Sequence, residues 1–208
     1  MLLSLLTSNP ILFGIIAIGI LLAITIHEFA HAWVADKLGD PTPRYQGRVT
    51  LNPMAHLDPI GTIAIFVAGF GWGKPVPFDP YNLKEPARDG ALIALAGPLS
   101  NLLLATALAA LIHLGILPTI LVAAATIIMQ INVMLALFNL VPIHPLDGSK
   151  IMMAILPKNS AYEYESFMER YGLFVLLFMI LPWNGTSPVS QLISPAIDLV
   201  MRLLLLQI

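Results

Sequence analysis

A short pattern of ionisable residues, HEFAH at positions 27–31, lies inside the first long apolar stretch of the chain. Residues four apart share one face of a helix, so the imidazoles of His27 and His31 can reach the same metal ion. Glu28 lies beside them and need not bind the metal, so its carboxylate can take a proton from an attacking water molecule. The spacing therefore predicts a metal site with an adjacent general base, which suits hydrolysis.

The position of this motif within an apolar stretch strengthens the prediction. Ionisable side chains in lipid are costly, at about 2.5–3.5 kcal/mol per charge even by low estimates. A metal ion facing a water-filled cavity would offset that cost. The alternative is a polar patch at the cytoplasmic end of the span, because Asp36 and Lys37 follow closely. We favour the metal site, since isolated surface histidines would leave the cost uncompensated.

A third ligand is needed, because a catalytic zinc site typically has three protein ligands and one open position. The chain has no cysteine, so the third ligand must be His, Asp or Glu. Asp147 is the strongest candidate, in the polar break NLVPIHPLDG at positions 139–148. Asp147-Gly148 alone is typical of an exposed turn. Asp147, however, follows the third full span on the predicted cytoplasmic side, where the first span carries its histidines. This shared membrane depth favours a metal ligand over an exposed turn.

The composition places these residues in a membrane protein. Of 208 residues, 58% are hydrophobic and 11% are charged, with a net charge of −2. Ordinary soluble domains are about 25% charged. The balance also excludes a polybasic surface, so we expect no nucleic-acid partner. We expect an all-α polytopic membrane protein, integral and multi-pass.

Apolar runs of about 20 residues mark the spans. Full spans are predicted at 10–34, 91–115 and 118–141, with weaker membrane segments at 60–70, 171–183 and 189–208. We therefore expect a helical bundle of about four to six membrane segments. Six of the ten Lys and Arg lie between positions 37 and 88, and three more between 150 and 170. The positive-inside rule places both regions on the cytoplasmic side.

The region from 44 to 80 is expected to contain a small β-rich re-entrant or interfacial segment. Its β-leaning pieces are Arg48–Leu51 and residues 74–78. Prolines in the second piece restrict it to an edge or an extended loop. An edge strand at Arg48–Leu51 could hold an extended substrate by main-chain hydrogen bonds. The alternative is an ordinary surface loop.

Three motifs in order make the chain resemble the site-2 protease family of intramembrane zinc metalloproteases. Residues 27–31 match the family's HExxH, residues 139–148 match its Asn-x-x-Pro-x-x-Pro-Leu-Asp-Gly type motif, and Gly97 to Asn101 match Gly-Pro-x-x-Asn. The resemblance covers residues 10–156 and is greatest to short bacterial or archaeal members without PDZ or CBS domains. We expect a single membrane-embedded metalloprotease domain over 1–208, with a core at about 10–156 and C-terminal membrane helices at about 162–208.

The resemblance implies that His27, His31 and Asp147 bind one Zn²⁺ and that Glu28 is the general base. The implied activity is hydrolysis of peptide bonds in or near transmembrane segments, with membrane-protein substrates and the lipid bilayer as partners. The implied location is a prokaryotic cell membrane, with the active site toward the cytoplasm. The alternative is a non-enzymatic metal-binding or metal-carrying membrane protein, which has no need of Glu28 beside the histidines.

The resemblance also suggests roles for two asparagines. Asn139 is expected to donate to the developing oxyanion, and Asn101 to line the substrate site or brace the spans. An interhelical hydrogen bond of about 1 kcal/mol is the alternative for both. His144 departs from the family pattern, and it and His56 have no assigned role: His144 could be a fourth donor, a neighbour of a ligand or a solvent-facing side chain, and His56 a residue of the substrate region or a gate.

Overall fold

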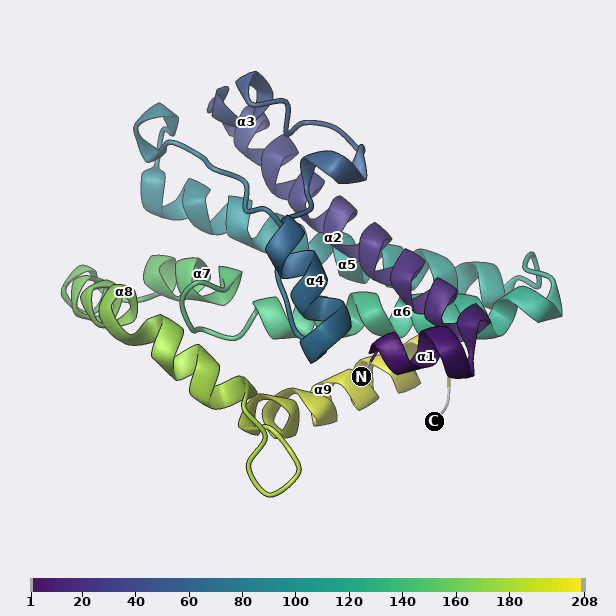
Figure 1. The fold of residues 1–208 in the computed structure, drawn as a ribbon. Coiled ribbons are helices and arrows are strands. Elements are labelled where there is room, and N and C mark those ends of the chain that lie inside the picture. The colour runs from purple at the N-terminus through teal and green to yellow at the C-terminus, as the bar shows by residue number, and fades with distance from the viewer. Residues whose placement is uncertain (1, 207–208) are drawn as a thin grey trace.

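Three long helices form the centre of the molecule in the computed structural model, which describes residues 2–206. They are α2 (Pro10–Leu38), α5 (Pro86–His113) and α6 (Thr119–Asn139), and each is long and apolar enough to cross a membrane. All three pack against one another, as Figure 1 shows. The three predicted full spans are therefore confirmed as helices, and the protein is a polytopic helical membrane protein.

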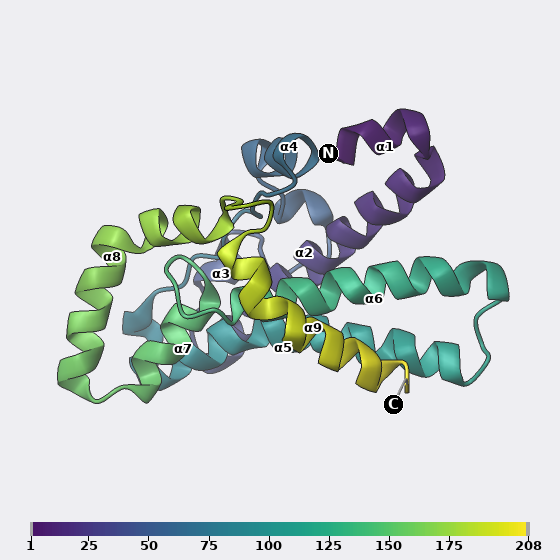
Figure 2. The same cartoon turned by 90° about the horizontal axis from the view of Figure 1, so that it is seen from below.

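Local sequence signals set the ends of these helices. The side chain of Asn9 accepts a hydrogen bond from the backbone N–H of Leu12, and Pro10 occupies the first turn of α2, where its missing N–H costs nothing. Gly39 ends α2 with a φ of 111°, which favours glycine. A short turn with Gly115 at a φ of 65° reverses the chain between α5 and α6, and Figure 2 shows these helices as an antiparallel pair.

The remaining helices flank the central three. Helices α1 (Leu2–Ser8) and α4 (Pro59–Ala68) lie side by side near the N-terminus, and α9 (Pro188–Leu204) packs along α6. Figures 1 and 2 show α7 (Asp147–Ile155) between α5 and α8 (Lys158–Ile180). The short elements are α3 (Thr42–Tyr45), η1 (Pro53–Ala55) and η2 (Pro80–Asn82).

The region from 44 to 80 contains short helices joined by irregular backbone. Within the described residues, its one β interaction is an isolated bridge between Leu57 and Gly73. The expectation of a small sheet here is not confirmed. The guanidinium of Arg48 donates to the carbonyl oxygens of Lys74 and Pro75. The two β-leaning pieces are thus joined by a side chain and not by a ladder, and Arg48–Leu51 offers no strand edge to a substrate.

Asp40 joins the end of α2 to the segment that leads into α5. Its fully buried carboxylate accepts hydrogen bonds from the backbone N–H and hydroxyl of Thr42, the backbone N–H of Asp79 and the amide of Asn82, at 2.6–3.1 Å. Burial raises the pKa of Asp40, but these hydrogen bonds outweigh burial and hold the pKa below its ordinary value of 3.8. The ionised form is therefore the one that stabilises this junction.

We predict that Asp40→Asn lowers the unfolding temperature of the purified protein at pH 7, because an amide cannot accept all of these hydrogen bonds. A depressed pKa in the folded state adds stability above the unfolded-state pKa, and this stability is lost as the pH falls through the folded-state pKa. The difference between wild type and variant should therefore shrink as the pH falls below about 4. Thermal unfolding across pH measures both effects. The exposed carboxylate of Glu163 provides the control Glu163→Gln. A difference that stays constant down to acid pH would contradict the prediction.

Candidate metal centre

The two histidines of α2 lie opposite Asp147, at the start of α7. Nε2 of His27 is 3.1 Å from Oδ2 of Asp147, and Nε2 of His31 is 3.2 Å from the same oxygen. The potential ligand atoms of the three residues lie within 4.8 Å of one another. Both histidines are buried, with 5% and 7% of their surface exposed. The fold therefore gathers two nitrogens and a carboxylate from segments far apart in the sequence, in a group that could hold a metal ion.

Each imidazole is oriented through its other nitrogen. Nδ1 of His27 lies 2.7 Å from Oδ1 of Asn101, and Nδ1 of His31 lies 2.7 Å from the carbonyl oxygen of Ile93. Both partners are oxygens on α5, so each Nδ1 donates its proton there. Nε2 of each ring then carries no proton, and its lone pair can bind a metal ion.

Gly97 of α5 allows the histidines to lie this close to the neighbouring helix. A Cβ atom at position 97 would lie 2.6 Å from Cε1 of His31 and 2.7 Å from Cε1 of His27. Real Cβ contacts are almost never that short, so a side chain here would displace the rings. Pro98, the next residue of α5, has no N–H, so the helical hydrogen bond to the carbonyl of Ala94 is missing at this point.

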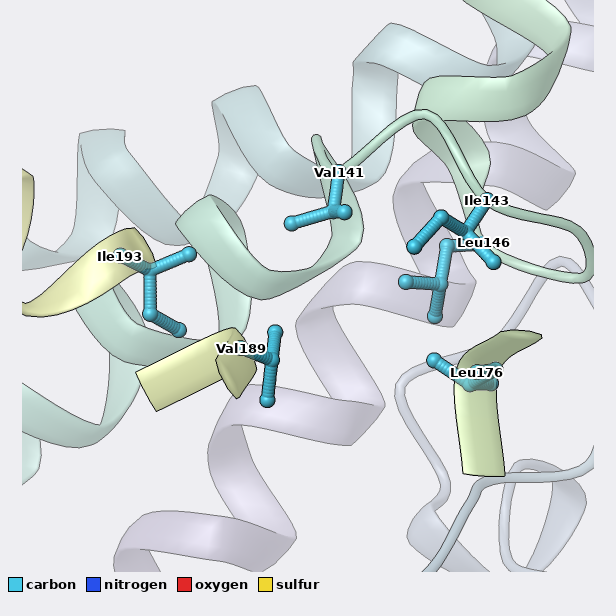
Figure 3. Packing of buried hydrophobic residues seen from close by; sticks show 6 residues of the cluster. All are labelled: Val141, Ile143, Leu146, Leu176, Val189 and Ile193. Atoms are coloured by element: carbon cyan, nitrogen blue, oxygen red, sulfur yellow. The ribbon is translucent and has the colours of Figure 1, made fainter. Parts of the chain in front are cut away.

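Asp147 is positioned by the loop that precedes it. Figure 3 shows that residues of this loop pack with side chains of α8 and α9; the cluster comprises Val141, Ile143, Leu146, Leu176, Val189 and Ile193. Gly148 permits the tight turn, because a Cβ atom there would overlap the carbonyl group of Leu140. The C-terminal helices thus hold the loop that carries the carboxylate.

Glu28 is half-buried beside the histidines, under the segment that follows α4. A Cβ atom at Gly73 would lie 3.3 Å from Oε1 of Glu28 and 2.9 Å from a side-chain carbon of Ile24. The backbone at Gly73 therefore covers the glutamate. The next residue, Lys74, is held by its N–H to the carbonyl of His56 and by its own carbonyl to Arg48. The carboxylate is thus placed beside the metal-binding group and next to a polar backbone.

The two asparagines suggested by the family motif lie in different surroundings. Asn101 is fully buried between helices and contacts His27, so its position favours bracing over contact with a substrate. Asn139 is half-buried at the end of α6, and its Nδ2 donates to the carbonyl of Leu135 in its own helix. The described structure brings Asn101, but not Asn139, into hydrogen bonding with a histidine of the centre.

The other histidines lie apart from the metal-binding group. His144 is exposed and packs against Gly172 of α8. His56 is fully buried, and its Nε2 bonds to the carbonyl oxygen of Thr50 at 2.7 Å. His113 bonds to the carbonyl oxygen of Leu204. None of these three belongs to the group that could hold a metal in the described residues.

Sequence reasoning missed Asn132 of α6, which is fully buried and bonds to Asn101 at 2.8 Å. The available signal was an amide in the middle of an otherwise apolar span, where a polar side chain needs a partner. It also missed the side-chain role of Arg48, whose guanidinium is buried although it carries a charge. Which carbonyls these side chains reach is decided by helix packing and could not be inferred from spacing.

The histidine pair of α2 and the aspartate that begins α7 form a group that could hold a metal ion, with Glu28 adjacent, which is the residue set of a metallopeptidase. Residues 116–181 match the family model described as Peptidase family M50. The chain is also 39% identical to a putative zinc metalloprotease over 90% of its length, so it belongs to peptidase family M50, the site-2 protease family that its motifs resemble.

The relatives are bacterial and archaeal proteins. "Putative zinc metalloprotease YwhC" of Bacillus subtilis is 39% identical over 197 residues, covering 90% of each chain. "Putative zinc metalloprotease Rip2" of Mycobacterium tuberculosis is 30% identical over 81% of this chain and 66% of the relative. "Zinc metalloprotease MJ0392" of Methanocaldococcus jannaschii is 26% identical over 85% of this chain and 46% of the relative. No solved structure matches significantly.

We predict that Gly97→Ala weakens zinc binding by at least about tenfold, because the added methyl group displaces both imidazoles from Asp147. Gly90→Ala is the matched control on the same helix, since its Cβ would meet its nearest neighbour at 3.9 Å, an ordinary contact. Competition with a zinc chelator on the purified protein measures the effect. Equal zinc affinity in Gly97→Ala and wild type would show that the rings do not depend on this close approach.

Proposed function

We propose that this protein hydrolyses peptide bonds in or near transmembrane segments of membrane proteins, with one zinc ion held by His27, His31 and Asp147. The observation that supports this most directly is the convergence of two Nε2 atoms and one carboxylate oxygen at separations of 3.1 and 3.2 Å. Membership of a family of membrane zinc metalloproteases supports the same activity.

The donor set fits zinc. Bond lengths near 2 Å in a tetrahedral arrangement put ligand atoms roughly 3–3.5 Å apart, which the observed separations match. Two imidazoles and one carboxylate are three protein ligands, so a fourth position would remain open, as in catalytic zinc sites. Zinc bound there would polarise the scissile carbonyl and lower the pKa of a water molecule to about 7.

In this proposal Glu28 is the general base. Its carboxylate takes the proton of the attacking water and then delivers it to the leaving nitrogen of the peptide. Asn139 is proposed to donate to the oxyanion, because an amide has two N–H donors and its bond to Leu135 uses one. The substrate must unwind before attack, since a helix keeps its carbonyls in internal hydrogen bonds.

The proposed domain is the whole chain, 1–208, with its core at about 10–156 and C-terminal membrane helices at about 162–208. Residues 1, 207 and 208 lie outside the described part. Between one and three of the helices α4, α8 and α9 would add to the three spanning helices and bring the membrane segments to between four and six. Their exposed surfaces are rich in large apolar side chains, among them Ile60, Phe174 and Leu203, which supports contact with lipid.

The proposed orientation places the metal centre toward the cytoplasm of a prokaryotic cell. Lys37, Arg44 and Arg48 follow the histidines along the chain, whereas the turn between α5 and α6 carries no Lys or Arg. Basic residues concentrate in cytoplasmic loops.

We predict that Glu28→Gln abolishes cleavage of a membrane-embedded reporter, by about 10²-fold or more, while zinc affinity changes little. The amide keeps the shape of the side chain but cannot accept the proton. Cleavage and zinc content are measured on the same reconstituted preparation, with Glu163→Gln as the surface control. Cleavage that survives in Glu28→Gln would remove this mechanism, and a wild type that binds zinc without cleaving any membrane segment would favour a metal carrier.

The orientation can be tested by labelling, because the chain contains no cysteine. Tyr45 is 84% exposed beyond α2, and Ile116 is 60% exposed in the turn between α5 and α6. We expect an impermeant maleimide to label Ile116→Cys in intact cells, and Tyr45→Cys only after the membrane is opened. The reverse pattern would place the metal centre on the outer side.

A further inference from the structure

Two asparagines from different helices meet next to His27 in the interior of the bundle. Asn101 of α5 and Asn132 of α6 are both fully buried. Oδ1 of Asn101 lies 2.7 Å from Nδ1 of His27, and Nδ2 of Asn101 donates to Oδ1 of Asn132 at 2.8 Å. These contacts form a continuous line of hydrogen bonds from α6 through α5 to the imidazole on α2.

The orientation of the Asn101 amide is determined by its other partners. Nδ2 donates to two oxygens, the carbonyl of Ala23 at 3.0 Å and the side chain of Asn132. A flipped amide would place its oxygen against both, so Oδ1 is the atom that faces His27. An amide oxygen can only accept a hydrogen bond, and Nδ1 of His27 must therefore carry the proton.

Asn132 is oriented in turn by its own helix. Its Nδ2 donates to the carbonyl oxygen of Ile128 at 2.8 Å, which leaves Oδ1 facing Asn101. The carbonyl of Ile128 can only accept a hydrogen bond, so it sets the orientation of the Asn132 amide. The oxygen of Asn132 then helps to set the orientation of the Asn101 amide.

We infer that Asn101 and Asn132 are positioning residues that select the tautomer and ring direction of His27, so that Nε2 is presented to the metal. The inference rests on the proposed function, since it concerns zinc bound at His27. His31 needs no such pair, because its Nδ1 bonds directly to the carbonyl of Ile93. Partners of this kind hold a ligand ring in place, and their loss typically weakens metal binding by about 10–100-fold.

A purely structural role predicts a different result. If the asparagines only join helices, their removal lowers the unfolding temperature and leaves the zinc affinity of the folded protein unchanged. If they position His27, zinc affinity falls, and Asn132 affects it only through Asn101. A double-mutant cycle on zinc affinity separates these roles.

The experiment measures the zinc dissociation constant of the purified full chain in detergent, by chelator competition, with thermal unfolding of each variant alongside. Asn101→Leu should bind zinc about 10–100-fold more weakly. Asn132→Leu should weaken binding by a smaller factor, because the bond to Ala23 still holds Asn101. The double variant should match Asn101→Leu alone. The controls are Thr106→Val on α5 and Thr126→Val on α6, whose hydroxyls donate to the carbonyls of Leu102 and Val122 in their own helices.

Wild-type zinc affinity in both single variants would overturn the inference. So would an Asn132→Leu effect that is equally large in the presence and absence of Asn101, since Asn132 would then not act through it. If Asn101→Leu fails to fold, the comparison of Asn132→Leu with Thr126→Val decides, and equal affinities overturn the inference. A wild type that binds no zinc would instead contradict the proposed function itself.

Discussion

His27 and His31 can lie inside a bundle of apolar helices because their ring nitrogens are hydrogen-bonded by groups of neighbouring segments. A buried polar group without a partner costs on the order of 2–7 kcal/mol. Both nitrogens of each imidazole therefore need a partner. Asn101 and the carbonyl of Ile93 accept the Nδ1 protons of the two rings, and each Nε2 faces Oδ2 of Asp147, where a shared zinc ion would bind all three atoms. Meeting this requirement fixes how α2 lies against α5 and how close α7 must come.

The same requirement explains the small residue in the contact between α2 and α5. The rings occupy the space where a side chain at position 97 would stand, so α5 approaches through a glycine. Asn101 follows one helical turn later and lies fully buried against His27. The Gly-Pro-x-x-Asn element therefore combines space for one histidine pair with a hydrogen-bond partner for one of its members.

The parts of the chain outside the three spans also position the centre. The loop before Asp147 owes its direction to apolar contacts with α8 and α9, although these helices have weaker span signals than the central three. On the other side, Arg48 holds the backbone at Lys74 and Pro75, next to the Gly73 backbone that covers Glu28. Aspartate and glutamate thus depend on segments whose own sequences show no catalytic pattern.

Residue spacing and hydropathy were enough to predict the shared face of the two histidines and the three spanning helices. The four-residue separation of His27 and His31 fixes their common face because helical geometry is local, and span length follows from bilayer thickness. The predicted sheet at 44–80 is absent from the described residues, since prolines at 75 and 77 cannot donate and Arg48 binds the free carbonyls instead. The sequence named Asp147 as a third ligand, but its distances to both histidines and the partnership of Asn101 with Asn132 were decided only by tertiary structure. These contacts join residues 31 to 120 positions apart, and only the packing of whole helices brings such groups within hydrogen-bonding distance.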